Sequence, residues 1–342
     1  MIHLPAVATV SPSLDALLFS YWAGQEQLRA LLDGQPFSSC DDWDERLTVV
    51  VSRAVPAQLA HWGDGAAELL GWPPEQMRAV VELLLQPGAD AHRQALRQHG
   101  VQGRTLLALL AAPPMKTLAG RTALPEQLSA IPAFGCERLA AGVLAAQLNA
   151  QLLQLDLAPL TGRKLWRYLE WGWVMAEPLA AKRNLDSWRL RLLLLWLLWG
   201  WASQLAAVKR QLSQMRQFHQ EKARLAGNRE LVRRLEQLRV PAPPLVTLLA
   251  TGSQQALTQL RCWGMGDGWY AQQLREWQAL LPPRLRSPYA RALYLLHRLA
   301  AAAQLGESPY AVDEPVNQTL QPLIAPEELL QLLALRPKGL QL

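Results

Sequence analysis

The sequence predicts an all-α protein, an irregular helical bundle with an N-terminal helical extension. Three observations support this fold class. Leu, Ala, Gln and Arg dominate the 342 residues, whereas Ile, Thr and Lys are scarce, so strong helix formers outnumber β-branched residues. Apolar residues recur at helical spacing, and the alternating pattern of strands is scarce. Finally, no fixed-period repeat is found, which argues against a solenoid.

The first elements follow from local signals. The segment Leu14–Leu32 has helical spacing and stops at an Asp-Gly pair, so we expect a helix. Asp44–Val55 is also expected to be helical, although its β-branched run leaves a short strand as the alternative. A Gly-Trp-Pro-Pro break then precedes a helix at Glu75–Leu85, with Pro74 near its first turn. Residues 1–74, which end at this double proline, form an N-terminal extension or subdomain.

Proline and glycine divide the rest of the chain into further helical pieces. In order, they are expected at 86–100, 101–114, 123–155, Gly162–Ala181, Ser187–Val208, Ser213–Leu225, Arg229–Leu238, Pro243–Thr251, Asp267–Leu281, Ser287–Leu305 and Pro326–Leu335. Residues 75–306 form the main helical domain in this interpretation. Residues 307–342 are a C-terminal tail with a short helix.

One helix contains an unusual apolar run, LLLLWLLWGWA at 192–202. No charge occurs from Leu192 to Val208, but these 17 residues are at the short edge of what crosses a bilayer. Trp196, Trp199 and Trp201 lie in the first two-thirds of the run rather than at two interfaces, and no second hydrophobic segment supports a membrane bundle. A helix that is apolar all round also suits the centre of a large protein. We therefore expect a buried core helix and no membrane span.

The charge pattern does not predict a nucleic-acid partner. The formal net charge of +6 comes from scattered arginines, whereas nucleic-acid binding needs Lys and Arg clustered on one face. The densest segment is Arg216–Arg239, which Glu221, Glu230 and Glu236 interrupt. A solvated helix face is the expected explanation.

The cysteines and the N-terminus indicate the cytoplasm. Cys40, Cys136 and Cys262 are odd in number and far apart, with no metal-ligand spacing, so we expect reduced thiols. The N-terminal segment lacks a basic region followed by a sustained apolar region, so no signal peptide is expected.

Six segments stand in an order that has a counterpart in a known family. They read MRAVVELLLQPGADAHRQALRQHGVQGRTLLALLAAP, ALPEQLSAIPAFGCERLAAGVLAAQLN, KLWRYLEWGWVMAEPLA, SWRLRLLLLWLLWGWASQL, ELVRRLEQLRVPAPPLVTLL and SPYARALYLLHRLAAAAQLG. Their order and spacing resemble those of the HDOD domain, a helical signalling module related to the HD phosphohydrolases. Gly135, Arg138 and Leu139 match the family's LG-x-x-R-L pattern. The resemblance covers roughly Glu75 to Gly306 and implies an HD-like helical fold.

The chain departs from the enzymes of this family at their metal ligands. Those enzymes use a His, a His-Asp pair and later His or Asp residues to hold metal, which lowers the pKa of bound water. Tyr168 stands in the first His place, Trp199-Gly200 in the His-Asp place, and Ala250–Gly252 where relatives often carry histidines. The resemblance therefore implies a protein without catalytic metal, cofactor or enzymatic activity. A degenerate small-molecule pocket at Tyr168, Trp199 and Gly200 is one expectation.

The expected function is a non-catalytic HDOD-like signalling or scaffold protein of a bacterial cytoplasm, acting through a protein partner. Fourteen tryptophans exceed what a core needs, and exposed tryptophans mark partner surfaces. Most of the tryptophans are expected in the buried core; if several are exposed together, the candidate surface consists of Trp166, Trp171, Trp173 and Trp188. The alternative is a membrane-associated accessory component of a secretion or pilus assembly, anchored through residues 192–208.

Three other segments carry weaker chemistry. His92 and His99, with Asp90 nearby, could share a helix face, but surface histidines are the simpler interpretation. The acidic stretch 40–45 is expected to favour a helix N-terminus. The glycine-rich stretch 261–268 lacks the lysine and preceding strand of a phosphate-binding loop, so we expect a flexible loop.

Overall fold

The computed structural model describes residues 14–23, 42–61, 80–81, 84–85, 136–152, 155, 161–238, 240–279, 286–306 and 324–337. Within these ranges every regular element is a helix and no strand occurs, which confirms the all-α class. The helices are α1 (Leu14–Trp22), α3 (Asp42–Val49), the π-helix η1 (Val50–Ala54), α4 (Val55–His61), α11 (Cys136–Leu152), α12 (Thr161–Ala181), α13 (Ser187–Leu225), α14 (Arg229–Gln237), α15 (Ala242–Leu249), α16 (Gly252–Cys262), α17 (Trp269–Gln278), α18 (Pro288–Leu305) and α20 (Pro326–Ala334).

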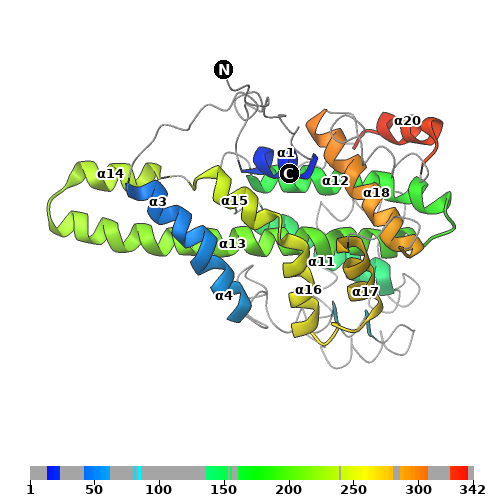
Figure 1. The fold of residues 1–342 in the computed structure, drawn as a ribbon, viewed down its shortest axis with the longest axis horizontal. Coiled ribbons are helices and arrows are strands. Elements are labelled where there is room, and N and C mark those ends of the chain that lie inside the picture. Colours follow the sequence, from blue (N-terminus) through cyan, green and yellow to red (C-terminus); the bar gives the residue numbers. More distant parts are fainter. Residues whose placement is uncertain are drawn as a thin grey trace, which may run out of the picture.

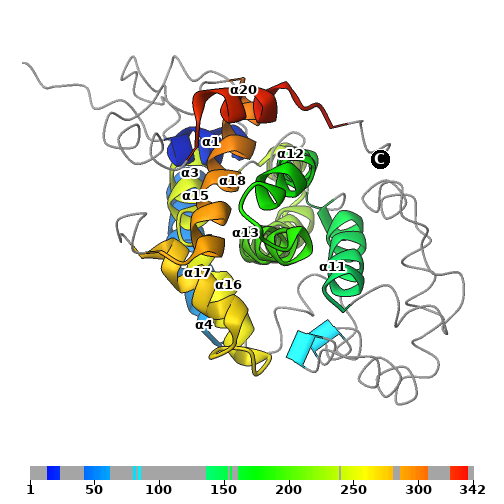
Figure 2. The same ribbon diagram turned by 90° about the vertical axis from the view of Figure 1, so that its right-hand side faces the viewer.

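The long helix α13 runs through the centre of the protein. Seen end-on, it is surrounded by α12, α11, α16 and α18 (Figure 2). Every residue from Leu192 to Val208 is buried, as expected for a helix that is apolar all round. The prediction of a core helix is thus confirmed.

The structure bears directly on the alternative of a membrane anchor. Among the described helices, only α13 is long and apolar enough to cross a membrane, and 94% of its most apolar 18-residue window is buried inside the protein. In this conformation residues 192–208 present no face to lipid. An anchoring role would require the run to leave the core.

Helix α13 is longer than the sequence analysis predicts. We expected two helices, Ser187–Val208 and Ser213–Leu225, but the structure has one continuous helix of 39 residues. The intervening Lys-Arg-Gln-Leu contains neither proline nor glycine and consists of good helix formers, so nothing interrupts the backbone. At its start, the Asp186 side chain accepts hydrogen bonds from the backbone N–H groups of Trp188 and Arg189, at 2.7 and 3.1 Å, which fixes the N-terminus.

The N-terminal and C-terminal segments share the core of the main helices. Leu14, Leu18 and Trp22 of α1 belong to the same hydrophobic cluster as α12, α13 and α18, and so do Leu329 and Leu332 of α20. Buried side chains on either side of both predicted boundaries are therefore in one cluster. The divisions at 74/75 and 306/307 remain predictions.

Helix α16, which the sequence analysis does not predict, packs closely on α13. A Cβ atom on Gly200 would lie 2.1 Å from the carbonyl oxygen of Gly252, and one on Gly252 would lie 2.0 Å from Cδ1 of Trp201. These separations are far below van der Waals contact, so both positions need glycine for the close approach. The crossing places the start of α16 beside the middle of α13. The helical spacing of the apolar residues Ala256, Leu257 and Leu260 is the sequence signal that could have predicted α16.

Candidate functional site

The residues of the predicted degenerate pocket are packed inside the core. Tyr168 on α12 contacts Trp201 edge-on, with ring centroids 5.7 Å apart, whereas Trp199 contacts Trp263, also at 5.7 Å. Gly200 is closed off by the carbonyl of Gly252. Tyr168 and Trp199 are both fully buried. Tyr168, Trp199 and Gly200 thus pack against different neighbours within the core.

Tyr168 begins a hydrogen-bonded chain, from the core to the half-buried Asp15, that the sequence analysis did not predict. Its hydroxyl oxygen lies 2.7 Å from Nδ1 of His297 on α18, and Nε2 of His297 lies 3.0 Å from Oδ1 of Asp15 on α1. Burial is the larger cause, and the negative charge of Asp15 the smaller one, that raises the pKa of Tyr168 well above its ordinary value of 10. The phenol therefore keeps its proton, and the imidazole of His297 connects it to the Asp15 carboxylate.

Aromatic rings enclose this chain. His297 contacts Trp201 and Trp277, with centroids 5.8 and 5.5 Å apart, and Tyr168 contacts Trp22 at 5.3 Å. Tyr168 and His297 are only 0% and 1% exposed, so a substrate could not reach the hydroxyl or the imidazole in this conformation. The arrangement suits a structural link of α1, α12 and α18.

In the described residues, the side chains that could bind a metal ion are not grouped together. No group of three or more His, Cys, Asp or Glu within the described ranges is arranged to hold a metal ion. His92, His99 and Asp90 lie outside the described residues, as does the start of the acidic stretch 40–45, from which α3 begins at Asp42. The expectation that the protein holds no metal or cofactor stays a prediction.

The tryptophans proposed as a partner surface are mostly internal. Trp166, Trp171 and Trp173 are 1%, 7% and 4% exposed, and Trp188 is half-buried. Helix α12 turns Trp166, Trp171 and Trp173 toward neighbouring helices, and large aromatic rings contribute most to stability when buried. These residues therefore do not form an exposed surface, which corrects the expectation.

Two of these tryptophans instead stack with arginines at the start of α13. Cζ of Arg191 lies 4.6 Å from the ring centroid of Trp188 and 5.3 Å from that of Trp173. Cζ of Arg138, on α11, lies 4.8 Å from the ring of Trp188. Arg191 also forms an ion pair with Glu177 at 3.1 Å, which neutralises its buried charge. The cations and rings join α11, α12 and α13.

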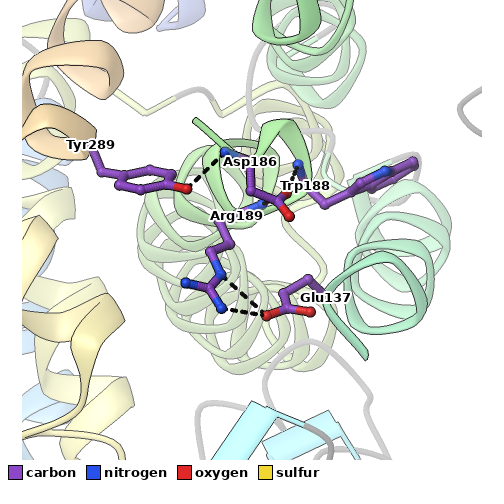
Figure 3. Close-up of polar contacts among 5 residues, drawn as sticks. All are labelled: Glu137, Asp186, Trp188, Arg189 and Tyr289. Atoms are coloured by element: carbon purple, nitrogen blue, oxygen red, sulfur yellow. Dashed lines mark hydrogen bonds and ion pairs between the residues drawn. The ribbon is translucent and has the colours of Figure 1, made fainter. Parts of the chain in front are cut away.

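Polar contacts around Asp186 complete this junction (Figure 3). Tyr289 on α18 accepts a hydrogen bond from the backbone N–H of Asp186 at 2.8 Å. Arg189 donates from Nε and Nη2 to one carboxylate oxygen of Glu137 on α11, each at 3.2 Å. Four helices thus meet at the N-terminus of α13, and the contacts hold the core helix in place.

The glycine-rich stretch 261–268 is a turn between two helices. Helix α16 continues to Cys262, Gly264 adopts a left-handed φ of 72°, and α17 starts at Trp269. Arg275 donates to the carbonyl oxygen of Gly266 and lies 3.5 Å from the Asp267 carboxylate. Arg275 thus contacts the turn from α17, and the expected flexibility of this stretch stays a prediction.

The most distinctive surface is a helical hairpin. The last part of α13 and α14 extend beyond the other described helices at one end of the molecule (Figure 1). We call residues 209–238 the basic arm. They contain eight Lys or Arg and three Glu, a formal net charge of +5. The cations are Lys209, Arg210, Arg216, Lys222, Arg224, Arg229, Arg233 and Arg234. The segment thus holds most of the net charge of the chain.

Local capping explains why the arm folds back at its tip. Gly227 has a φ of 67°, in the left-handed region, and the N–H of Asn228 donates to the carbonyl of Ala223 at 2.8 Å, the pattern that ends helices at glycine. The Asn228 side chain then accepts from the N–H of Leu231 at 3.0 Å and starts α14. Buried Leu235 packs α14 onto α13.

The tip of the arm combines charge with exposed apolar side chains. Phe218 is 54% and Leu225 is 85% exposed, and these are two of the five large apolar side chains exposed among the described residues. Nζ of Lys222 lies 4.3 Å from the ring centroid of Phe218. Hydrogen bonds from Arg233 and Arg234 lower the pKa of Glu230 to about 2, so this carboxylate stays ionised between two cations.

Comparisons with known proteins do not assign the chain. No family model matches it, and no curated protein or solved structure was found to be significantly similar.

Proposed function

We propose that the protein is a non-catalytic, HDOD-like scaffold or signalling protein of the cytoplasm, and that the basic arm binds an acidic protein partner. The observation that carries the proposal is the arm itself, with its net charge of +5 and its exposed Phe218 and Leu225. The order and spacing of the six HDOD-like segments support the family part. The absence of usable metal ligands at Tyr168, Trp199 and Gly200 supports a role without catalysis.

The chemistry of the arm favours a protein over other anionic partners. Arginine outnumbers lysine by six to two, and arginine and aromatic side chains contribute most to protein interfaces. Three glutamates, Glu221, Glu230 and Glu236, lie among the cations and are exposed. They would repel a phosphate backbone or an anionic lipid surface, whereas a protein can place a cation opposite each of them.

The apolar residues give the partner a specific attachment. Phe218 and Leu225 are two turns apart on α13, so they share a face of the helix. A partner that offers an apolar pocket with acidic residues at its rim would bury both side chains and pair with the surrounding arginines. Charge alone would speed the encounter without fixing its orientation.

Affinity capture with matched variants tests this proposal. Wild-type protein, the double variant Phe218→Ser/Leu225→Ser and the control Leu330→Ser would each be incubated with an extract of the source cells. Leu330 on α20 is also exposed, at 68%, so its substitution has a similar chemical effect away from the arm. We expect the arm variant to lose the specific partner, identified by mass spectrometry, and Leu330→Ser to keep it.

Folding and competing ligands are controlled in the same series. Circular dichroism should give the same melting temperature for all three proteins because the substituted side chains are exposed. Capture of the same proteins by the arm variant, or of none by wild type, would overturn the proposal. So would arm-dependent binding to phosphatidylserine vesicles or to duplex DNA in place of a protein.

A further inference from the structure

An open cavity of about 400 Å³ lies where η1 and α4 face α13, α15 and α16. The helices that form it cross the middle of α13 (Figure 1). Its buried floor consists of Val51, Leu59, Gln204, Pro244, Leu248 and Gln255, and the remaining lining residues are exposed or half-buried. The volume falls within the usual size of a small-molecule pocket, roughly 300–1,000 Å³.

The floor contains a buried polar atom without a partner. Gln204 is 1% exposed, and its Nε2 donates to Oγ1 of Thr251 at 2.9 Å. Its Oε1 is buried and accepts no hydrogen bond. Thr251 cannot satisfy it, because its only hydroxyl proton goes to the carbonyl of Leu248 at 2.8 Å. A buried acceptor that has left water without a replacement donor is unfavourable, so an N–H or O–H group brought to Oε1 would remove this cost.

The hydroxyl groups of two lining threonines are also acceptors toward a ligand. Thr247 donates its proton to the carbonyl of Pro243, and Thr258 donates to that of Gln254, both at 3.1 Å. Each hydroxyl has a single proton. Toward a ligand, both groups therefore offer lone pairs, as Oε1 of Gln204 does.

The lining carries no charged side chain. A charged ligand would lose its hydration without gaining a counter-charge, which is strongly unfavourable. Val51, Leu59 and Leu248 provide an apolar wall. Val51 lies on η1, and π-helical turns inside α-helices occur frequently at functional sites.

We infer that this cavity binds an uncharged small molecule with an apolar body and an N–H or O–H group. The donor bonds to Oε1 of Gln204, and the apolar body lies against Val51, Leu59 and Leu248. This site does not include Tyr168, Trp199 or Gly200, and the inference does not depend on the partner proposed for the basic arm. The close crossing of α13 and α16 at Gly200 and Gly252 helps to form the cavity, because it brings the start of α16 beside Gln204.

Three probes of similar shape test the inference on the full chain. Benzamide has an apolar ring and an N–H donor, acetophenone replaces the amide nitrogen by a methyl group, and benzoate is charged without a donor. Titrations would be followed by ¹H–¹⁵N correlation spectra. We expect benzamide to shift resonances of α15, α16 and Gln204, to bind about 10-fold more tightly than acetophenone, and benzoate not to bind.

Two variants separate Gln204 from the rest of the lining. Gln204→Met keeps the length of the side chain but removes the acceptor, so the preference for benzamide over acetophenone should disappear. Gln254→Met places the same side chain at an exposed lining position and should keep the preference. If Gln204→Met does not fold, the three probes on wild-type protein decide the matter. Equal binding of benzamide and acetophenone, binding of benzoate, shifts elsewhere in the protein, or no benzamide binding up to its solubility would each overturn the inference.

Discussion

The hydroxyl oxygen of Tyr168 lies 2.7 Å from Nδ1 of His297, inside the core and 129 residues away in sequence. The bond joins α12 to α18, and Asp15 extends it to α1. Because both side chains are buried, water cannot replace either partner. This polar chain thus adds to the other hydrogen bonds that join α1, α12 and α18, among them Lys164 to the carbonyl of Tyr21 and Gln304 to the carbonyl of Lys164.

Removing the hydroxyl of Tyr168 should destabilise the protein. Tyr168→Phe keeps the ring contacts with Trp22 and Trp201 but leaves Nδ1 of His297 without a partner, which costs about 1–3 kcal/mol. Urea unfolding measures the change. Tyr21→Phe is the control, because Tyr21 is half-buried and its ring contact with Lys164 survives; we expect a change within about 0.5 kcal/mol. Equal effects of the two substitutions would contradict the role assigned to the buried bond.

The Asp15 carboxylate should make stability fall in acid. Burial raises the pKa of Asp15, but the charge and hydrogen bond of His297 and the charge of Arg298 outweigh it, so that its pKa lies below 3.8. The unfolded chain therefore binds the proton first, and the stabilisation present above about pH 4 is lost as the pH falls through the lower, folded pKa. Asp15→Asn should lack this loss when stability is measured across that range. Asp267→Asn removes a fully exposed carboxylate and should leave the profile unchanged.

Substitutions of the core tryptophans should be severe. Trp199→Asp places a charge among fully buried apolar side chains and should prevent stable folding. Trp196→Ala removes a fully buried ring that contacts Trp263 and should cost about 3–5 kcal/mol. Phe218→Ala, on the exposed part of the same helix, should change stability by less than about 0.5 kcal/mol. Near-wild-type melting temperatures for both tryptophan variants would mean that this stretch faces a partner or lipid.

The helix crossing predicts a ranking of two glycine substitutions. Gly200→Ala would place Cβ 2.1 Å from a backbone oxygen that cannot move aside, so the helices must separate at a cost of about 3 kcal/mol or more. Gly227→Ala meets no atom within 4 Å but keeps a φ of 67°, which costs about 1–2 kcal/mol. Thermal unfolding gives the order. A larger loss for Gly227→Ala would refute the close approach of α13 and α16.

Purified protein should contain no stoichiometric catalytic metal and hydrolyse no phosphoester. At the positions that the proposed HDOD relationship equates with the ligands of HD enzymes, the buried phenol of Tyr168 keeps its proton, tryptophan offers only a donor, and glycine has no side chain. Elemental analysis and turnover of a cyclic nucleotide measure the two properties. Stoichiometric iron, manganese, magnesium or zinc together with turnover would overturn the prediction.

Elements with local end signals could be predicted from the sequence. The expected helix Ser287–Leu305 is observed as Pro288–Leu305, with Ser287 as its N-cap and Gly306 at a left-handed φ of 72°. The expected Gly162–Ala181 is observed as Thr161–Ala181. In both cases the signals lie within a few residues of the helix end, so no knowledge of the tertiary structure is needed.

Features that depend on distant contacts could not be predicted. His297 is a single histidine in an apolar helix, and its partners Tyr168 and Asp15 are 129 and 282 residues away. The two helical pieces of the basic arm were predicted, but not its extension from the core, because that depends on α13 continuing past Val208. The burial of Trp166, Trp171 and Trp173 depends on helix packing, which residue type alone does not specify.

The unbroken length of α13 has a mechanical consequence. At 1.5 Å per residue, its 39 residues extend about 58 Å, and the last 17 of them form part of the basic arm, some 25 Å long. One stiff rod therefore connects the tryptophan-rich centre of the protein to its outermost tip. A tilt of about 5° at the core would displace the tip by roughly 2 Å. Any tilt of the core part of α13, where Gln204 lies five residues before the arm begins, would therefore be carried undiminished in angle to the arm.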